Sequence, residues 1–569
     1  MVRLVGCEFS RINKGAKTPV RPAAAVTFLA CIFYFSGCQS VGNLRVSFSQ
    51  SGSSIEAYDF LEVTANVPWP RTGNPFTNVT LDGWFETADG TRRSQVEGFC
   101  DSVDGSVFRI RFMPPAAGDY RYKVEFHQGW RSKSFTGNFH ATDGHRRGPI
   151  RVDSQYPWHF LWEGTGEHYY FNGTTAYWLI GWRDDKVIEA AIDRLHALKV
   201  NRLRVTVAGR TNLMYGEPVM TGADWTVFIT PWSAKDPEDI YHPGFDYTRF
   251  DVAYWQKFER ALRYARERDI VVSLVLDMND GRVHPAEFSS DERRFIHYAV
   301  DRFAAFSNVT WDLGDDLDGY RGSVWTRITG TLLKGWDPYK HLATSHPLNP
   351  AHQDRAADWF DFTSIQEWSR NQHALMLEQR KLQEKAGRII PQTNEEYGYE
   401  DHYPKWAPKP DADSADTLRR MAWEIAMAGG YQTTGETARR GTNVWPDTGG
   451  GWMNGRGDDS MTMLQGYGHI IDFFTSFEWW KAEPHDELVN AGDFCLAEPG
   501  RSYAIYLPRG GKATVTLQAG MYNATWFDPS TGERIALAQA KGPKWISPAA
   551  PNNKDWSLLL QSAQTAPSN

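Results

Sequence analysis

Two pairs of adjacent carboxylates are, by residue type, the strongest candidates for catalysis. Asp315 and Asp316 follow the run NVTWDLG, and Glu395 and Glu396 follow RIIPQTN. Two carboxyl groups on opposite sides of a pocket can cleave a glycosidic bond, because one protonates the leaving oxygen while the other attacks or activates water. Each pair alone is equally consistent with a solvated strand end or a partner for an arginine. The interpretation therefore needs a fold that brings both pairs together.

Residues 151–489 alternate strand-like and helix-like runs, with helices expected at 185–198, 254–268 and 291–306. This alternation predicts an α/β fold, a parallel (β/α)8 TIM barrel, in which functional side chains lie at the C-terminal ends of the strands. The carboxylate pairs close the fourth and seventh predicted strands, so both would face one barrel mouth. The eight predicted strands are HYYFNGTTAYWLIG, NRLRVTV, DIVVSLVLD, NVTWDLG, HLATSH, DFTSIQEW, RIIPQTNE and YQTTGE.

Short alternating runs flank the barrel segment on both sides. Residues 55–150 contain LEVTANV and VFRIRF, and residues 490–569 contain SYAIYLP and KATVTLQA, separated by turns rich in Gly, Pro and Asp. This spacing is typical of antiparallel sheets packed face to face. We therefore expect an N-terminal Ig-like β-sandwich and a C-terminal β-sandwich.

The composition of the N-terminus predicts an export signal. Residues 1–37 combine five basic residues with an apolar run from Ala23 to Phe35, which is typical of a signal peptide. Ser36-Gly37-Cys38 resembles a bacterial lipoprotein cleavage box. We expect an exported outer-membrane lipoprotein that contacts the membrane through a lipid on Cys38, with an uncleaved anchor or an ordinary signal as alternatives. Residues 38–54, rich in Ser, Gly and Gln, are expected to form a tether.

The composition excludes some partners and favours others. The 569 residues carry a net charge of −8 without a basic stripe, which argues against nucleic acid. The 24 Trp residues exceed what packing alone requires, and such rings stack well on sugars. Motifs for zinc, phosphate or a serine nucleophile are absent, so the sequence predicts neither metal nor cofactor.

The two acidic motifs also resemble those of a known superfamily. Trp311, Gly314, Asp315 and Asp316, together with Glu396-Tyr397-Gly398, resemble the retaining (β/α)8 glycoside hydrolases. More narrowly, Glu396-Tyr397-Gly398-Tyr399-Glu400, with Asp in place of the usual strand-four Glu, resembles the apiosidase-like catalytic family. PFTNVTLDGWFETADG resembles the β-sandwich that often precedes such barrels, and ATWFDPSTGE resembles a C-terminal module labelled collagen-binding.

The resemblance implies a retaining glycoside hydrolase that acts on a polysaccharide or oligosaccharide, with Asp316 as acid/base, Glu396 as nucleophile and no cofactor. Spacing alone does not choose these residues over their neighbours, although only one residue of each adjacent strand pair can face the mouth directly. The resemblance places Asp315 where the superfamily commonly has Asn or Gly. There it could contact a sugar hydroxyl, or raise the pKa of Asp316 through like charge.

Further polar and aromatic residues near strand ends are candidates for substrate binding, and each is also consistent with packing or a salt bridge. Trp445 and Trp452 lie in a Gly-rich loop and could stack on sugar rings. The other candidates are Trp178, Arg204, Asp277, Asn279, His346, Glu367, Trp368 and Tyr399.

Two other function classes compete with the hydrolase. A non-catalytic glycan-binding lipoprotein would use the barrel as a scaffold, but it would not need doubled acids at two strand ends. Adhesion to a protein such as collagen depends only on the label of the C-terminal module, and analogy of fold is weak support for function. The sequence leaves open the sugar, its linkage and anomeric configuration, endo or exo action, and the oligomeric state.

Overall fold

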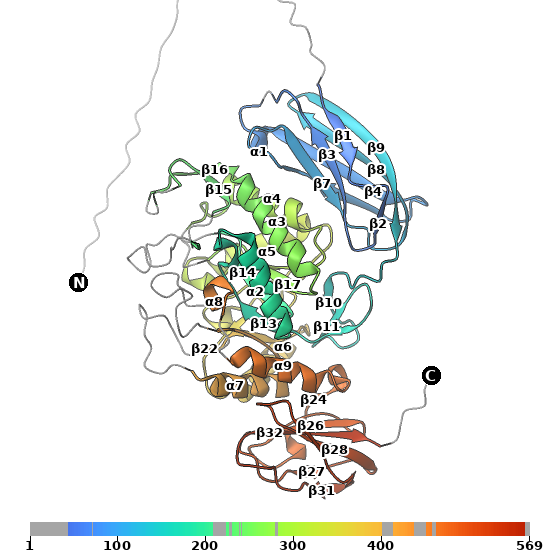
Figure 1. The fold of residues 1–569 in the computed structure, drawn as a ribbon, viewed down its shortest axis with the longest axis vertical. Coiled ribbons are helices and arrows are strands. Elements are labelled where there is room, and N and C mark those ends of the chain that lie inside the picture. The colour runs from blue at the N-terminus through green and yellow to red at the C-terminus, as the bar shows by residue number, and fades with distance from the viewer. Residues whose placement is uncertain are drawn as a thin grey trace, which may run out of the picture. The chain divides into compact units, whose positions relative to one another are not determined.

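The computed structural model describes residues 44–70, 72–208, 224–226, 230–237, 239, 242–278, 283–400, 413–436, 451–457 and 462–563. The chain divides into two units, Met1–Asn43 and Leu44–Asn569, and all described residues belong to the second. In Figure 1 this unit runs from a blue β-sandwich through a green and yellow barrel to a red β-sandwich. None of the described helices combines the length and the apolar character needed to cross a membrane.

The central domain is a curled parallel sheet of eight main strands in the order β19-β18-β17-β14-β13-β23-β21-β20, with β22 beside β23. Asp361 N donates to Ala343 O at 2.8 Å, so the segments leading into β20 and through β19 meet. This confirms the predicted α/β barrel, and each predicted strand overlaps one strand of the observed barrel sheet. The strands are β13 (Asn172–Thr175), β14 (Arg202–Thr206), β17 (Val271–Val275), β18 (Val309–Asp312), β19 (Ala343–Thr344), β20 (Ile365–Gln366), β21 (Thr393–Glu396), β22 (Tyr399–Glu400) and β23 (Tyr431–Glu436).

Helices follow most of these strands and cover the sheet (Figure 1). Their starts have ordinary N-caps: Asp184 accepts from Lys186 N, and Ser289 accepts from Glu292 N. Because helices cover the sheet, β14, β17 and β18 are buried along their whole length. The helices are α2 (Asp185–Ala197), α3 (Val252–Arg266), α4 (Ser290–Phe303), α5 (Ser323–Trp336), α6 (Gln372–Lys385), α7 (Ala415–Met427), α8 (Gly451–Asn454) and α9 (Met463–Phe474), with 3-10 turns η1 (Leu179–Gly181), η2 (Leu317–Gly319), η3 (Pro350–His352), η4 (Trp479–Lys481) and η5 (Asp486–Leu488).

The N-terminal sandwich packs a four-stranded sheet, β1-β3-β7-β6, on a five-stranded sheet, β2-β9-β8-β4-β5. Its core is a separate hydrophobic cluster that includes Leu61, Phe85 and Ile110. The strands are β1 (Ser47–Gln50), β2 (Ser54–Glu56), β3 (Leu61–Asn66), β4 (Val79–Thr87), β5 (Arg93–Glu97), β6 (Phe99–Cys100), β7 (Val107–Phe112), β8 (Gly118–Gln128) and β9 (Arg131–Thr142), with helix α1 (Pro75–Asn78).

The tether predicted for residues 38–54 is wrong at its C-terminal end. Residues 47–50 form β1, which pairs antiparallel with β3 in a four-residue register from Ser47 with Asn66 to Gln50 with Val63. Pairing with β3 supplies hydrogen bonds that a Ser- and Gly-rich composition does not reveal. The folded sandwich therefore begins before residue 55.

The C-terminal sandwich contains a seven-stranded sheet, β24-β25-β26-β32-β28-β29 with β30 on β28, and the pair β27-β31. It packs on α7, where Trp423 stacks on Tyr506 with ring centroids 5.5 Å apart and Arg419 donates to Asp555 at 3.0 Å. The strands are β24 (Glu483–Pro484), β25 (Phe494–Glu498), β26 (Ser502–Leu507), β27 (Thr514–Thr516), β28 (Met521–Phe527), β29 (Arg534–Ala536), β30 (Ala540–Lys541), β31 (Lys544–Ile546) and β32 (Trp556–Ser562). Two small sheets complete the fold: β10 (Ile150–Val152), β11 (Phe160–Trp162) and β12 (His168–Tyr169), and β15 (Trp232–Ala234) with β16 (Phe245–Phe250).

Arg111 joins the N-terminal sandwich to the barrel. Its guanidinium donates to both carboxylate oxygens of Glu259 on α3, at 2.6 and 3.0 Å, and to Glu62 at 2.9 Å. The Arg111 side chain is 4% exposed and lies over the Phe99 ring. The charges are therefore paired in a place with little solvent.

Arg111→Met should lower stability by about 1.5–3 kcal/mol, because it removes charged hydrogen bonds from a buried cluster in which Glu259 keeps Arg302 and Glu62 keeps Arg109 as partners. The control is Arg121→Met, since Arg121 forms an exposed pair with Glu86, and such pairs contribute about 0–1 kcal/mol. Thermal unfolding followed by circular dichroism would measure both. Equal midpoints for the two variants would show that Arg111 contributes no more than a surface pair.

Candidate active site

Carboxylates from the ends of β18 and β21 meet at one histidine. His346 Nε2 lies 3.6 Å from Asp315 Oδ1 and 3.6 Å from Glu396 Oε2. Each of the three residues contributes an atom that lies within 4.8 Å of the other two. The two carboxylate side chains are each 10% exposed, whereas the histidine is fully buried. The fourth and seventh strands therefore do bring acids together at the barrel mouth.

The structure separates the roles of Glu395 and Glu396. Glu395 is fully buried, pairs with Arg202, and lies 3.4 Å from Arg204 Nε. Burial alone would raise the pKa of Glu395, but Arg202 and Arg204 outweigh it and hold the pKa below its usual value. The pairing of β20 with β21 shifts register between Ile365 and Gln366, and Glu396 lies at His346 Nε2. Glu395 is a fixed negative charge inside the barrel, and Glu396 is the glutamate that reaches the mouth.

Asp315 and Asp316 are not related by strand alternation, because β18 ends at Asp312. Asp315 Oδ1 accepts from Arg204 Nη2 at 2.9 Å and from the Tyr177 hydroxyl at 3.1 Å, and these donors favour its charged form. Asp316 is half-buried, and its backbone adopts the left-handed conformation, with φ 53°, at the start of η2. Non-glycine residues in this conformation are uncommon and gather at functional sites.

Tyr177, which the sequence analysis did not single out, connects these groups. Its hydroxyl accepts from Arg204 Nη1 at 2.9 Å and donates to Asp315. Burial raises the pKa of Tyr177 well above its ordinary value, and the charges of Asp315, Glu396 and Asp316 raise that pKa further. All three acids therefore lie around one phenol. The available sequence signal was its position directly before the predicted Trp178.

Ser364 is a second residue that the sequence analysis missed, and it orients the histidine. Its hydroxyl donates to Glu395, whose carboxylate can only accept, and it lies 2.8 Å from His346 Nδ1. Because that hydroxyl proton is already used, we assign the ring proton to Nδ1. Burial and the charge of Arg204 lower the pKa of His346, which keeps the ring neutral. His346 Nε2 is then an acceptor beside two carboxylates, so a ligand placed there must bring hydrogens or positive charge.

Three predicted aromatic residues form a row beside Tyr177. Trp452 lies 6.4 Å from the Tyr177 ring centroid, Tyr399 lies 5.0 Å from Trp452, and Trp368 lies 5.6 Å from Tyr399. They come from different loops and strands, yet the barrel brings them together. Trp368 is half-buried, whereas Tyr399 and Trp452 are buried. The row has the flat apolar faces on which sugar rings stack.

The remaining predicted residues have local partners. Trp178 is fully buried, and its carbonyl accepts from Trp225 Nε1 at 3.0 Å. Asp277 accepts from Arg321 Nη2 at 3.0 Å, and Glu367 accepts from Ser369 N at 3.1 Å. These contacts hold the three residues in place, and their predicted role in substrate binding stays a prediction. The predictions for Asn279 and Trp445 lie outside the described residues.

Sequence families match each of the three domains. Residues 208–437 match the family described as "Apiosidase-like, catalytic domain". Residues 54–127 match a domain of unknown function, DUF5060, and residues 485–561 match the "Putative collagen-binding domain of a collagenase". A comparison with curated protein sequences finds no significant match.

Solved structures share the fold at low sequence identity. A protein described as a "putative glycoside hydrolase" from Bacteroides vulgatus ATCC 8482 is 19% identical, with a TM-score of 0.74, covering 90% of this chain and 100% of that chain. A glycoside hydrolase family 5 structure from the same organism is 15% identical, with a TM-score of 0.56, covering 73% and 94%. Residues 208–437 of the barrel therefore resemble an apiosidase-like catalytic domain, the solved structures share the fold, and together these matches support glycoside hydrolase activity.

Proposed function

We propose that the protein hydrolyses a glycosidic bond in a polysaccharide or oligosaccharide with retention of configuration, with Glu396 as nucleophile and Asp316 as acid/base. The observation that carries the proposal is the convergence of strand-four and strand-seven acids on His346. Retaining enzymes hold their two carboxyl groups about 5–5.5 Å apart, whereas inverting enzymes need about 6.5–9.5 Å. An oxygen of Asp315, the residue directly before Asp316, lies within 4.8 Å of a Glu396 oxygen, so the acids that follow strand four lie close to the proposed nucleophile.

The choice of Asp316 over Asp315 as the acid follows from their partners. Asp315 accepts from the Arg204 guanidinium and the Tyr177 hydroxyl, and a carboxylate held in its charged form is a poor proton donor. Asp316 is the next residue in the chain, and both acids act on the Tyr177 hydroxyl, so in this proposal the charge of Asp315 disfavours a second charge on Asp316. Asp315 is then left to orient the sugar and to keep its neighbour protonated.

The reaction proceeds in two displacements. In the first, a Glu396 oxygen bonds to the anomeric carbon, the bond to the leaving oxygen breaks, and Asp316 gives its proton to that oxygen. In the second, Asp316 takes a proton from water, the water oxygen bonds to the anomeric carbon, and the ester to Glu396 breaks. The fixed charges of Arg204 and Asp315 need no reorganisation during these steps.

A panel of plant, algal and microbial polysaccharides tests the activity, with new reducing ends as the readout. The anomer formed first, observed by proton NMR before mutarotation, tests retention. We expect at least one glycan to be cleaved, with retention. A first product of inverted configuration would contradict the proposed mechanism, and binding without cleavage of any bound glycan would favour a glycan-capturing protein.

The acceptor cluster of Asp315, His346 and Glu396 matches the nitrogen and oxygen ligands that Zn²⁺ prefers. Because the proposed nucleophile, Glu396, is one of these groups, added Zn²⁺ should inhibit turnover in competition with substrate. Removal of divalent cations with EDTA should leave turnover unchanged, because the chain itself supplies the acid and the nucleophile. Initial rates with and without each reagent measure this. Loss of activity in EDTA that one cation restores would contradict the prediction.

We also propose that the mature protein is an outer-membrane lipoprotein anchored through Cys38. The support is the Ser36-Gly37-Cys38 sequence after the apolar run, which lies outside the described residues. Cys38→Ala should move the protein from the membrane fraction to the soluble fraction, and mass spectrometry of the native N-terminal peptide should find a lipid-modified cysteine. An unmodified Cys38 would contradict the anchor.

A further inference from the structure

The five-stranded sheet of the N-terminal sandwich has a pocket of about 560 Å³, far from the acids of the barrel in sequence. The pocket lies on the solvent side of the sheet, because Leu81 and Phe85 of β4 point into the sandwich core whereas Trp84 and Glu86 alternate with them. Its lining residues are Trp84, Glu86, Arg93, Arg121, Tyr122, Lys123, Thr136 and Gly137. A tryptophan in the middle of an otherwise polar sheet face offers a flat apolar surface to a ligand.

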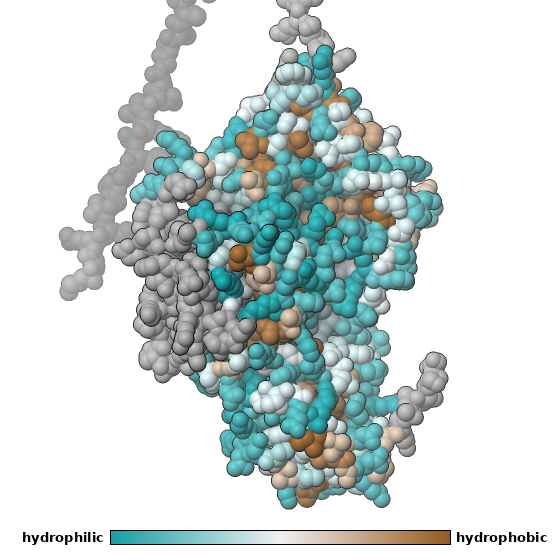
Figure 2. Space-filling model, in the orientation of Figure 1, coloured by the Kyte–Doolittle hydropathy of each residue, from teal (hydrophilic) through white to brown (hydrophobic). Residues whose placement is uncertain are grey.

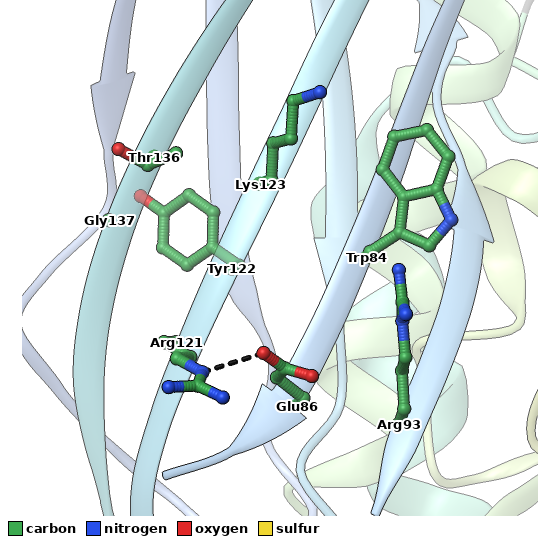
Figure 3. A pocket seen from close by; sticks show the side chains of 8 residues that line it. All are labelled: Trp84, Glu86, Arg93, Arg121, Tyr122, Lys123, Thr136 and Gly137. Carbon is green, nitrogen blue, oxygen red and sulfur yellow. Dashed lines mark hydrogen bonds and ion pairs between the residues drawn. The ribbon is translucent and has the colours of Figure 1, made fainter. Parts of the chain in front are cut away.

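Sheet pairing places the polar groups in rows around Trp84. Gln95, Trp84, Lys123 and Thr136 are successive cross-strand partners, so an amide, an indole, an ammonium and a hydroxyl follow one another across four strands. Figure 3 shows the Trp84 ring with the Lys123 ammonium on one side and the Arg93 guanidinium on another. The Lys123 Nζ lies 5.8 Å from the Trp84 ring centroid. Neutral hydrogen-bonding groups beside a ring suit a hydroxylated ligand.

The charge of the pocket is the opposite of that of the protein, whose surface is largely hydrophilic (Figure 2). Three basic side chains and one acidic side chain line it, whereas the whole chain carries a net charge of −8. Arg121 pairs with Glu86 at 2.6 Å, and Lys123 pairs with Glu125 at 3.1 Å. Among the described residues, Arg93 has neither a hydrogen bond nor an ion pair through its side chain. An exposed guanidinium without a partner, beside an aromatic ring, is available for a carboxylate, which it binds through two parallel hydrogen bonds.

We infer that this pocket binds an acidic glycan built from uronic acids. One sugar ring stacks on Trp84, its hydroxyls contact Gln95 and Thr136, and the carboxylates of that ring and its neighbours pair with Arg93 and Lys123. The site lies on the sandwich and does not depend on the proposed chemistry of the barrel. It would hold an acidic polymer against the protein, whichever bond the barrel cleaves.

Isothermal titration calorimetry on the full chain carrying Glu396→Gln tests the inference, because this variant should bind glycan without consuming it. The probes are tetramers of galacturonate, mannuronate and glucuronate, together with the methyl ester of each, which keeps the rings and removes the charge. We expect at least one acid to bind, its ester to bind at least tenfold more weakly, and the affinity to fall as salt rises. Equal binding of acid and ester, or binding of none of the acids, would overturn the inference.

Substitutions on the same sheet locate the site. Trp84→Ala should weaken binding at least tenfold, and Arg93→Met at least fivefold, without a change in the midpoint of thermal unfolding, because both side chains face solvent. Two matched controls should have no effect: Trp130→Ala, which removes another tryptophan of this domain, 81% exposed, and Arg92→Met, next to Arg93 but outside the pocket lining. If Trp84→Ala fails to fold, the affinity of the Arg93→Met variant alone tests the inference. Unchanged affinity in a folded Trp84 or Arg93 variant would overturn the inference.

Two more measurements distinguish a glycan site on the sandwich from a general anion surface and from the barrel mouth. Single-stranded DNA that competes with the uronate tetramer at equal charge concentration would indicate a general anion surface and would overturn the assignment to a glycan. A Trp84→Ala variant of the otherwise unchanged chain should still cleave a small soluble substrate found by the glycan panel. Binding is measured by calorimetry in a variant that should be inactive, whereas hydrolysis is measured by product release. The inferred binding site and the proposed hydrolysis are therefore tested separately, and either can be contradicted without the other.

Discussion

Glu396→Gln should reduce turnover by at least about 10⁴-fold, the order of loss seen when a group that forms a covalent intermediate is removed. The carboxylate oxygen that would bond to the anomeric carbon is replaced by an amide, whereas the size of the side chain is nearly unchanged. The Glu396 side chain lies at the mouth beside His346 and is 10% exposed, so the substitution should cost little stability. Initial rates on the glycan identified by the panel, together with the midpoint of thermal unfolding, measure both effects.

The matched control is the neighbouring Glu395→Gln. Glu395 neutralises Arg202 where both side chains are completely excluded from solvent, so its loss leaves a buried charge without its partner. We expect a cost of about 3–5 kcal/mol and a clear fall in the unfolding midpoint. The two glutamates are adjacent in sequence, but Glu396→Gln should lose turnover with little loss of stability, whereas Glu395→Gln should lose stability. Activity that survives in Glu396→Gln, in a correctly folded protein, would show that the nucleophile is a different residue.

Asp316→Asn should give the second large effect, and that effect should depend on the leaving group. With a natural glycan the first step needs a proton donor, so we expect a loss of about 10²–10⁴-fold. With an aryl glycoside of the same sugar that carries an acidic phenol, the first step needs little protonation and should remain fast. Azide, which needs no general base, should then accelerate turnover and give a glycosyl azide of retained configuration.

Comparing Asp315→Asn with Asp316→Asn identifies which aspartate is the general acid. Asn keeps an acceptor for Arg204 and Tyr177 but removes the negative charge between them. We expect a smaller loss that is similar for glycan and aryl substrates, because orientation of the sugar is weakened in both. Rescue by azide in Asp315→Asn and not in Asp316→Asn would reverse the two roles.

The barrel could be predicted from the sequence because strand-like and helix-like hydrophobic patterns alternate regularly along this segment. Each of the eight predicted strands overlaps an observed strand, and the helices predicted at 185–198, 254–268 and 291–306 are found within a few residues of those bounds. The ends of the strands were enough to place acids from the fourth and seventh strands at one mouth. Hydrophobic patterning therefore sufficed for the architecture.

The finer geometry of the site depends on features that patterning does not encode. A register shift between β20 and β21 lies at Glu395 and Glu396, and the left-handed backbone of Asp316 lies beyond the end of β18, so strand alternation alone predicts neither position. Tyr177 and Ser364 were missed because their importance comes from partners on other strands. Such contacts exist only after the barrel closes, so a single sequence gives no direct sign of them.

Arg202 and Arg204 pair with Glu395 and Asp312 inside a barrel where most structures have branched aliphatic side chains. Since one unpaired buried charge costs about 3–5 kcal/mol, and a whole domain is stable by about 5–15 kcal/mol, a change at one member of a pair is close to lethal for folding. These positions can change during evolution only together, or through a neutral intermediate that removes both charges. Related sequences should therefore show covariation of residue 202 with 395 and of residue 204 with 312.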